Sequence, residues 1–215
     1  WMMGAVTLER SGIAADNLVL QDNSGIGLGV YGRNVTLSRV TSQRNGLMGI
    51  MGNGAYGLAA SRILAVDNNV ERFNSAPASG GVKITRTRGV SVTDSAFRAN
   101  RGPGLWFDES VHDAKAIGNN LVGNTGHGLS YEISSTAVLA DNLVLDNGGF
   151  GFKINNADKL QIWNNTFVGN DRAINLVQDA RRNAQTSTPG HDPQRPNPDP
   201  TVPWILREIT VGNNV

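Results

Sequence analysis

Three polar residues recur at one position of three similar segments in the middle of the chain. Asp108 ends the segment GLWFD, Glu132 ends GLSYE and Asn155 ends GFKIN, and each segment begins with a glycine. If these segments are strands in successive turns of one coil, neighbouring strands lie about 4.8 Å apart and the two carboxylates lie side by side. Two like charges that close raise one pKa, which places a general acid beside a carboxylate, as glycoside hydrolysis requires.

The same residues permit two other interpretations, and the sequence leaves them open. Asp108 and Glu132, with Asn155, offer the hard oxygen ligands that Ca²⁺ prefers, so calcium is a candidate cofactor. Alternatively, the two acids belong to an exposed row that Lys83 and Lys153 neutralise diagonally across the strands. Such surface pairs have little energetic or functional weight.

A second outward row is expected beside the acids. Trp106 in this row is expected to be an exposed stacking platform for a sugar ring. Arg86 is a candidate for holding a carboxylated sugar through two parallel hydrogen bonds. His112, in the connection after Asp108, is a candidate base. The row reads Lys83, Trp106, Ser130, Lys153 and Asn175, and the predicted substrate-binding residues are Lys83, Arg86, Trp106, Asn155 and Asn175.

The elements that must position these residues repeat at a fixed interval. Gly104, Gly128 and Gly151 are 24 and 23 residues apart. A period of this size, with short alternating apolar runs between polar corners, is typical of a solenoid that buries its apolar face by stacking repeats. No run has the 3.6-residue period and length of a helix. Alternation directs Leu105, Phe107, Leu129, Tyr131, Phe152 and Ile154 inward and leaves Ser130, Glu132, Lys153 and Asn155 exposed.

Length and composition indicate one elongated domain. The chain has 215 residues, 26 glycines and no cysteine, with a net charge of +1. This charge does not suggest a nucleic-acid partner, and no apolar run is long enough to span a membrane. We expect residues 1–215 to be a single domain truncated at both ends, because the coil pattern has begun by Gly4 and stops within a coil at Val215. Two loop insertions are expected, at residues 71–80 and in the proline-rich segment 180–203.

Asparagines at the corners predict hydrogen-bonded ladders along the solenoid. Asparagine tolerates the left-handed backbone of a corner, and stacked amides can bond the coils above and below. We expect one ladder of Asn17, Asn68, Asn119, Asn142, Asn165 and Asn214, interrupted by Val40 and Ser95, and another of Asn45, Asn100, Asn124, Asn147 and Asn170.

The repeated segments NVTLSRV, DNNV, GLWFD, GNNLVGN, YEIS and WNNTFVGN resemble the right-handed parallel β-helix repeats of the pectate-lyase-like superfamily. The resemblance covers nearly the whole chain. It implies an all-β solenoid of about eight to nine coils of 22–24 residues, with three parallel sheets named PB1 to PB3.

The resemblance also implies a protein that is secreted or at the cell surface and whose partner is a polysaccharide. Enzymes of this superfamily include lyases, hydrolases and C5-epimerases that act on acidic polysaccharides. For a lyase it implies that Lys153 or Lys83 is the base that removes a proton next to a uronate carboxylate. Other members are adhesins, tailspikes and passive spacers, so a non-catalytic glycan-binding, adhesive or structural module is the alternative. Asp108, Glu132, Lys153 and His112 are the catalytic candidates.

Overall fold

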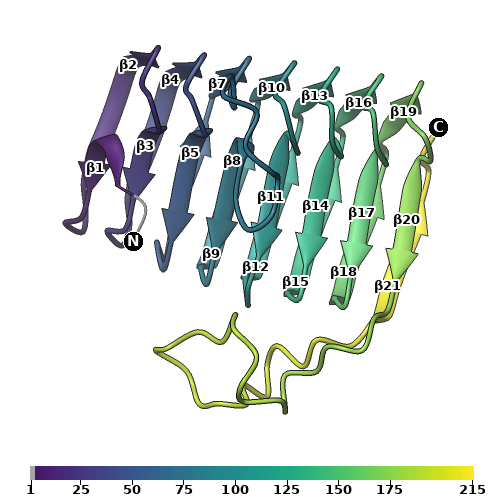
Figure 1. Ribbon diagram of the computed structural model, residues 1–215. Helices are drawn as coiled ribbons and strands as arrows, with labels where there is room; N and C mark the ends of the chain where they lie inside the picture. Colours follow the sequence, from purple (N-terminus) through teal and green to yellow (C-terminus); the bar gives the residue numbers. More distant parts are fainter. Residues whose placement is uncertain (1–2) are drawn as a thin grey trace.

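The computed structural model describes residues 3–215 of the chain, and none of these residues is in a helix. Its strands are all parallel and wind into a solenoid with one long face made of a single eight-stranded sheet (Figure 1). Trp1 and Met2, at the start of the first expected coil, lie outside the described residues. The strands of this sheet, in spatial order, are β1 (Gly4–Leu8), β3 (Ile26–Val30), β5 (Met48–Asn53), β8 (Gly80–Thr85), β11 (Leu105–Asp108), β14 (Leu129–Glu132), β17 (Phe152–Asn155) and β20 (Ile174–Val177).

The other thirteen strands form two rows that meet at a corner. The first row is β6 (Ala59–Ser61), β9 (Arg88–Thr93), β12 (His112–Ile117), β15 (Ser135–Ala140), β18 (Asp158–Trp163) and β21 (Arg207–Gly212). The second row is β7 (Leu64–Val66), β10 (Ala96–Arg98), β13 (Asn120–Val122), β16 (Leu143–Leu145) and β19 (Thr166–Val168). The long strands β2 (Ala14–Gln21) and β4 (Thr36–Gln43) each run through both rows.

The predicted all-β parallel β-helix is confirmed, and the sheet count needs one correction. The second and third predicted sheets are a single hydrogen-bonded sheet, because β4 pairs with β6 through Thr36–Ser38 and with β7 through Thr41–Gln43. Arg39 has a left-handed backbone with φ of 52°, which turns the chain inside the strand without ending it.

The predicted inward residues form the core of the solenoid. Leu105, Phe107, Leu129, Tyr131, Phe152 and Ile154 are all fully buried. Phe107 and Tyr131 contact each other on adjacent strands with ring centroids 5.7 Å apart. Burying an aromatic or aliphatic side chain of this size contributes about 1.5–3 kcal/mol, so the stack of coils is the main source of stability.

Two asparagine ladders run along the solenoid, with two corrections to their membership. In the first, the Nδ2 of Asn119 donates to Asn142 Oδ1 at 3.0 Å, and the pattern continues to Asn165 and Asn214. Asn68 belongs instead to the second ladder, where it lies between Asn45 and Asn100. Asn17 is exposed and has a left-handed backbone, as does its neighbour on the next coil, Arg39. Asn68 follows β7, at the same corner as Asn45 and Asn100, and Ile63 occupies the first-ladder position of this coil, where its amide donates to Ser95 Oγ at 2.9 Å.

Two long connections leave the solenoid. Residues 67–79 connect β7 to β8 and are called the insertion loop; they lie over the face of the eight-stranded sheet in Figure 1. Residues 178–206 connect β20 to β21 and are called the strap; they run back along the ends of the strands of that sheet (Figure 1). Strap residues contact coils well before their own place in sequence, as in the hydrogen bond from Ser110 Oγ to the Gly190 carbonyl at 2.8 Å.

Buried ion pairs and an aromatic side chain hold the strap in place. Arg88 at the start of β9 pairs with Asp192, at 3.6 Å, and with Asp199. Trp204 is fully buried in a small cluster with Ile133 and Val202. An arginine shared by two buried carboxylates is costly to break, so the strap is a fixed wall beside the sheet.

Candidate functional site

Asp108 and Glu132 are neighbours on the outer face of the eight-stranded sheet. They end β11 and β14, whose register pairs Phe107 with Tyr131 directly before them. Phe107 and Tyr131 point into the core, so alternation along each strand directs the next residue outward. The two acids therefore lie on one wall, one coil apart, as the repeat predicts.

The acids are nevertheless buried, contrary to the prediction that they face water. Asp108 is 6% exposed and Glu132 is 8% exposed, and Ser130 and Asn155, also expected to be exposed, are 2% and 5% exposed. These side chains are buried by the two long connections and not by the core. The insertion loop places the Pro77 carbonyl on the outer face of the sheet, and the strap places Arg181 there. The predicted groove is a covered site between these two segments.

Lys83 on β8 occupies the centre of one half of this site. Its Nζ lies 2.7 Å from Asp108 Oδ2 and donates to the carbonyl of Pro77, in the insertion loop, at 2.6 Å. The same Nζ lies 3.5 Å from the centre of the Trp106 ring, within the range of a cation–π contact. Lys83 is 4% exposed, so its three contacts make it a buried partner of Asp108 and not an open cation.

Arg181 of the strap closes the other half of the site. Its Nη2 lies 2.6 Å from Glu132 Oε1 and 2.7 Å from Asp179 Oδ2. Asn155 connects the same two acids: its Nδ2 donates to Asp179 Oδ2 at 3.2 Å and to Glu132 Oε1 at 3.4 Å. Glu132 is thus neutralised by Arg181 and not by Lys153, because the strap places its cation directly over the strand end.

Burial sets Asp108 apart electrostatically. Burial raises the pKa of Asp108 to about 6; the positive charge of Lys83 acts against this rise, and the negative charge of Glu132 adds to it. At Asp179, burial opposes ionisation, but hydrogen bonds from Arg181 and Asn156 outweigh it and hold the pKa well below its usual range. The wall therefore carries a carboxyl that can be protonated near neutral pH, and the strap places next to this wall a carboxyl that its hydrogen bonds keep ionised.

The structure distributes the remaining predicted residues unevenly around this site. Lys153 and Asn175 are partly exposed and lie in the predicted row with Trp106 and Ser130. Arg86 follows β8 and forms an ion pair with Glu109 at 3.0 Å. It lines a cavity of about 210 Å³ together with Tyr31, Met51, Asn53, Pro77, Ala78, Lys83, Thr85 and Glu109.

His112 is not brought to Asp108. It lies beyond the corner, on β12 of the other sheet, where its Nδ1 is 2.8 Å from Asp113 Oδ2 and its Nε2 is 3.4 Å from Thr136 Oγ1. The three residues between Asp108 and His112 turn the chain away from the outer face. Proximity in sequence was therefore a poor guide for this residue.

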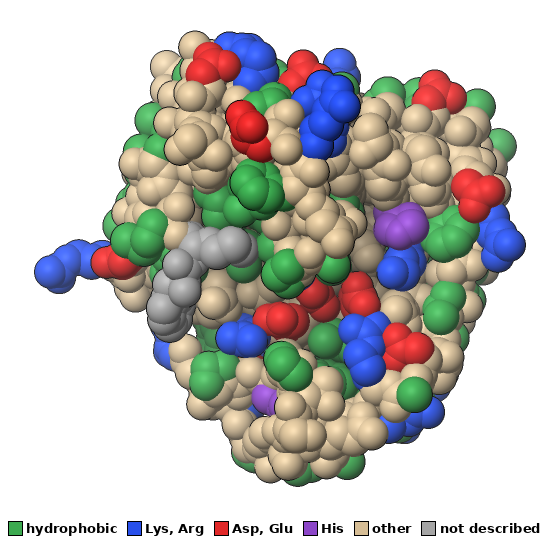
Figure 2. All heavy atoms as spheres, viewed as in Figure 1, with side chains coloured by type: hydrophobic (Ala, Val, Ile, Leu, Met, Phe, Trp, Pro, Cys, Tyr) green, Lys and Arg blue, Asp and Glu red, His purple; other side chains and the backbone are tan. Residues whose placement is uncertain are grey.

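Acidic and basic side chains gather in a hollow in the middle of the face shown in Figure 2. Three groups that contribute here had no signal in the repeat pattern: Arg181 and Asp179 come from the strap, and Glu109 from a corner. In the sequence, Arg181 and Arg182 lie a few residues after the apolar segment that ends at Val177.

The fold and the site define a parallel β-helix of the pectate-lyase-like type with an ionisable cluster on one sheet. The family model described as "Periplasmic copper-binding protein (NosD)" matches residues 9–185. The chain therefore belongs to this NosD family. No curated protein matches it.

Several solved structures share the fold at low sequence identity. The A-module of the Azotobacter vinelandii mannuronan C-5 epimerase AlgE6 is 12% identical with a TM-score of 0.67, over 83% of this chain and 54% of that one. The enzymatically active domain of bacteriophage CBA120 tailspike protein 2 is 15% identical with a TM-score of 0.59, over 82% and 33%. The T265N mutant of the periplasmic alginate epimerase AlgG is 13% identical with a TM-score of 0.56, over 80% and 46%. This chain spans about half or less of each.

The described residues do not fit a copper site of the kind that the family description names. Copper favours thiolate, thioether and imidazole ligands. The chain has no cysteine, and Met48 and Met51 are buried in an apolar cluster. The histidines lie apart: His112 on β12, His127 stacked on Phe150 before β14, and His191 stacked on Trp204 in the strap. Within residues 3–215, no group of three or more His, Cys, Asp or Glu side chains is placed to hold a metal ion.

Calcium at Asp108 and Glu132 stays a prediction. Each carboxylate already contacts a cationic side chain, at 2.7 Å from Lys83 and at 2.6 Å from Arg181. A calcium ion at this site would therefore have to displace at least one of these two side chains.

Proposed function

We propose that this protein binds a polysaccharide along the outer face of its eight-stranded sheet and acts on it by acid–base chemistry, with Asp108 as the proton-transferring group. The observation that supports this most is a pair of adjacent buried carboxyls with different cationic partners: Asp108, whose pKa burial raises to about 6, contacts Lys83, and Glu132 contacts Arg181. Two carboxyls whose surroundings separate their roles are the arrangement that glycosidic bond cleavage uses.

The surroundings of the carboxyls suit a sugar chain. Trp106 lies in the row beside them and is partly exposed, so part of its ring is available for stacking. Arg86, Lys153 and Arg181 are also partly exposed and supply positive charge for an acidic sugar. The solved structures with this fold include two alginate epimerases and the enzymatically active domain of a tailspike, which is consistent with a glycan ligand.

The reaction is proposed to be hydrolysis, with elimination and C5-epimerisation as the competing outcomes. In hydrolysis, protonated Asp108 would give its proton to the glycosidic oxygen as the bond from this oxygen to the anomeric carbon breaks, and Glu132 would face the positive charge that develops on the ring. A water molecule would then add to the anomeric carbon and return a proton to Asp108. A lyase or epimerase would instead remove a proton next to a uronate carboxylate, with Lys153 as the more accessible of the two predicted lysine bases. Lys83 is less suited to this step because Asp108 and Pro77 already hold its ammonium group.

A non-catalytic glycan-binding module is the second candidate, and one observation favours it. Both carboxylates are covered and already have cationic partners, so substrate would have to displace the insertion loop or Arg181 to reach them. A purely structural ion-pair network would have the same appearance. We further propose that the protein works outside the cytoplasm, in the periplasm or at the cell surface, in line with the description of its family. Among the described residues, no helix is long and apolar enough to cross a membrane.

The test is a panel of neutral and uronate-containing polysaccharides incubated with and without a chelator. New reducing ends without ultraviolet absorbance indicate hydrolysis, absorbance of unsaturated uronate indicates elimination, and a changed C5 configuration by NMR indicates epimerisation. Loss of activity with chelator would support calcium. Turnover should fall about tenfold per pH unit above about pH 6 if Asp108 is the acid, because the protonated form is then lost.

Two variants and a matched control decide the role of the acids. Asp108→Asn should reduce turnover at least about a hundredfold, the lower range of general acid catalysis, with Glu132→Gln also impaired. Asp158→Asn is the control, because Asp158 is a buried carboxylate paired with Arg207 on the other sheet. Equal turnover in Asp108→Asn and wild type would refute the catalytic role, and binding without turnover would favour the second candidate.

A further inference from the structure

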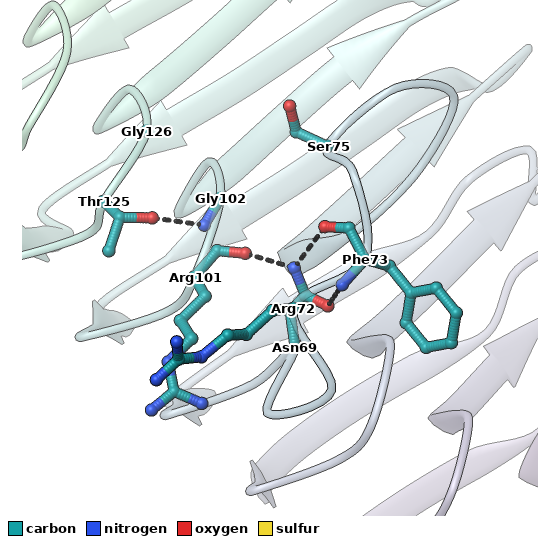
Figure 3. A pocket seen from close by; sticks show the side chains of 8 residues that line it. All are labelled: Asn69, Arg72, Phe73, Ser75, Arg101, Gly102, Thr125 and Gly126. Atoms are coloured by element: carbon teal, nitrogen blue, oxygen red, sulfur yellow. Dashed lines mark hydrogen bonds between the residues drawn. The ribbon is translucent and has the colours of Figure 1, made fainter.

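A second cavity, separate from the carboxyl site, lies at the opposite ends of the strands of the same sheet, where β11 and β14 begin. It has a volume of about 450 Å³ and lies between the insertion loop and the corners that precede β11 and β14 (Figure 3). Arg72, Phe73 and Ser75 of the insertion loop form one side. Arg101, Gly102 and Thr125 from two successive coils are among the residues that form the other. We call this cavity the arginine pocket.

The two arginines of this pocket have no acidic partner, unlike the six arginines of the described residues that form ion pairs. Arg86, Arg88 and Arg181, for example, each pair with a carboxylate. In the part of the chain that the structure describes, neither Arg72 nor Arg101 has an ion pair, and both are exposed. Arg101 uses one nitrogen to donate to the Val70 carbonyl at 3.0 Å, which directs its guanidinium toward the loop that carries Arg72.

A buried asparagine fixes the pocket in this shape. Asn69, 2% exposed, accepts a hydrogen bond from the Phe73 amide at 2.9 Å and donates to the Phe73 carbonyl at 2.9 Å (Figure 3). Its Nδ2 also donates to the Arg101 carbonyl at 2.6 Å. One side chain thus joins the insertion loop to the coil below it. The two guanidinium groups extend on the same side of the pocket in Figure 3, which places two positive charges together before any ligand arrives.

We propose that the arginine pocket is a binding subsite for an anionic sugar, with the sugar carboxylate held by Arg72 and Arg101 and the ring stacked on Phe73. Two guanidinium groups that lack acids suit an oxyanion, which each can hold through two hydrogen bonds. Phe73 lines the same pocket and is 53% exposed, with its ring across the pocket from the guanidinium groups in Figure 3; an exposed aromatic ring suits the apolar face of a sugar ring. A purely inorganic anion would not need this ring.

The position of the pocket extends the proposed function, on which this inference rests. The pocket lies at the edge where β11 and β14 begin, and Asp108 and Glu132 lie where they end. From Leu105 to Asp108 is three residue steps, or about 10 Å along the strand. The insertion loop reaches both places, since Phe73 lines the pocket and the Pro77 carbonyl holds Lys83. A glycan that runs along these strands could therefore occupy both sites. Its sugars would carry carboxylates, because the arginine pocket is proposed to hold one.

The test measures binding of oligogalacturonate and oligoalginate by isothermal titration calorimetry, with methyl-esterified oligogalacturonate as the uncharged match. We expect Arg72→Ala to weaken binding of the acidic oligomers about tenfold or more and to leave the ester nearly unchanged. This variant is a clean probe because the guanidinium of Arg72 has no partner within the described chain. Arg101→Lys should show a smaller loss, and Phe73→Ala should weaken the acid and the ester alike.

Matched controls separate this inference from the proposed function. Arg98→Ala removes an exposed arginine from β10, on a different face, and should bind as wild type does. Asp108→Asn should bind acidic oligomers normally while losing turnover. If Arg72→Ala binds them as tightly as wild type while Asp108→Asn loses turnover, the arginine pocket is refuted and the catalytic site stands. If wild type binds neither acid nor ester, both proposals are refuted. Equal competition by sulfate for the wild type and Phe73→Ala proteins, with no sugar preference, would reduce the site to one for free anions and refute the sugar assignment.

Discussion

Substituting Lys83 with methionine removes the positive charge that faces Asp108 and leaves an unbranched side chain of similar length over Trp106. The Nζ to Oδ2 distance is 2.7 Å and both side chains are less than one-tenth exposed, so solvent screens this pair weakly. Burial already raises the pKa of Asp108 to about 6, against the effect of Lys83. An adjacent opposite charge lowers a carboxyl pKa by about 1 to 3, so Lys83→Met should raise the pKa of Asp108 to about 7 or above.

The same change has a consequence for stability whose sign depends on pH. The folded-state pKa of Asp108 lies above the unfolded value of about 3.9, so its contribution to stability is full below about pH 4 and is lost as pH rises through about 6. In Lys83→Met this loss continues to higher pH. We therefore expect the free energy of unfolding to fall by about 1 to 2 kcal/mol relative to wild type at pH 7.5, and hardly at all at pH 5 apart from lost packing.

Urea denaturation at pH 5 and pH 7.5 measures the stability difference, and NMR titration of ¹³C-labelled aspartate carboxyls measures the pKa directly. Asp108→Asn assigns the resonance. The pH-dependent difference should disappear in the double variant Lys83→Met with Asp108→Asn, because no titrating carboxyl is left. Lys115→Met, an exposed lysine on β12, is the control. A pKa for Asp108 that stays at about 6 or falls in Lys83→Met would show that the reasoning about this pair is wrong.

Two further predictions concern the scaffold. Asn142→Ala should lower the free energy of unfolding by about 2–4 kcal/mol, because the buried amide donates hydrogen bonds to Asn165 and to the Ala116 carbonyl. The control Asn120→Ala, on the surface of β13, should lower it by less than about 1 kcal/mol. Chemical denaturation measures both values. Arg88→Met should release the strap by leaving the buried acids Asp192 and Asp199 unpaired, so limited proteolysis should cut within residues 178–206 faster while circular dichroism of the solenoid is unchanged. An uncut strap in Arg88→Met would mean that its other contacts, such as buried Trp204 and the Ser110–Gly190 hydrogen bond, hold it without Arg88.

The repeat period and strand alternation predicted the fold and much of one wall of the site. Leu105 and Phe107 point inward as expected, and Asp108 and Glu132 share the outer face as their spacing predicted. Such predictions succeed because each depends on local geometry: a strand alternates every residue, and a solenoid repeats every coil. The ladder position of Asn68 was wrong because Asn68 follows β7 and so stands at the second corner of its coil, while Ile63 occupies the position at the first corner.

The sequence by itself determined a parallel β-helix, the direction of each core side chain and the adjacency of the two acids. Tertiary structure alone decided that these acids are buried, that Lys83 and Arg181 are their partners, and that Arg72 meets Arg101 at the opposite edge. The physical reason is that the strap and the insertion loop have no repeat to fix their place. They fold onto distant coils through contacts such as Arg88 with Asp192, which no spacing in the chain specifies.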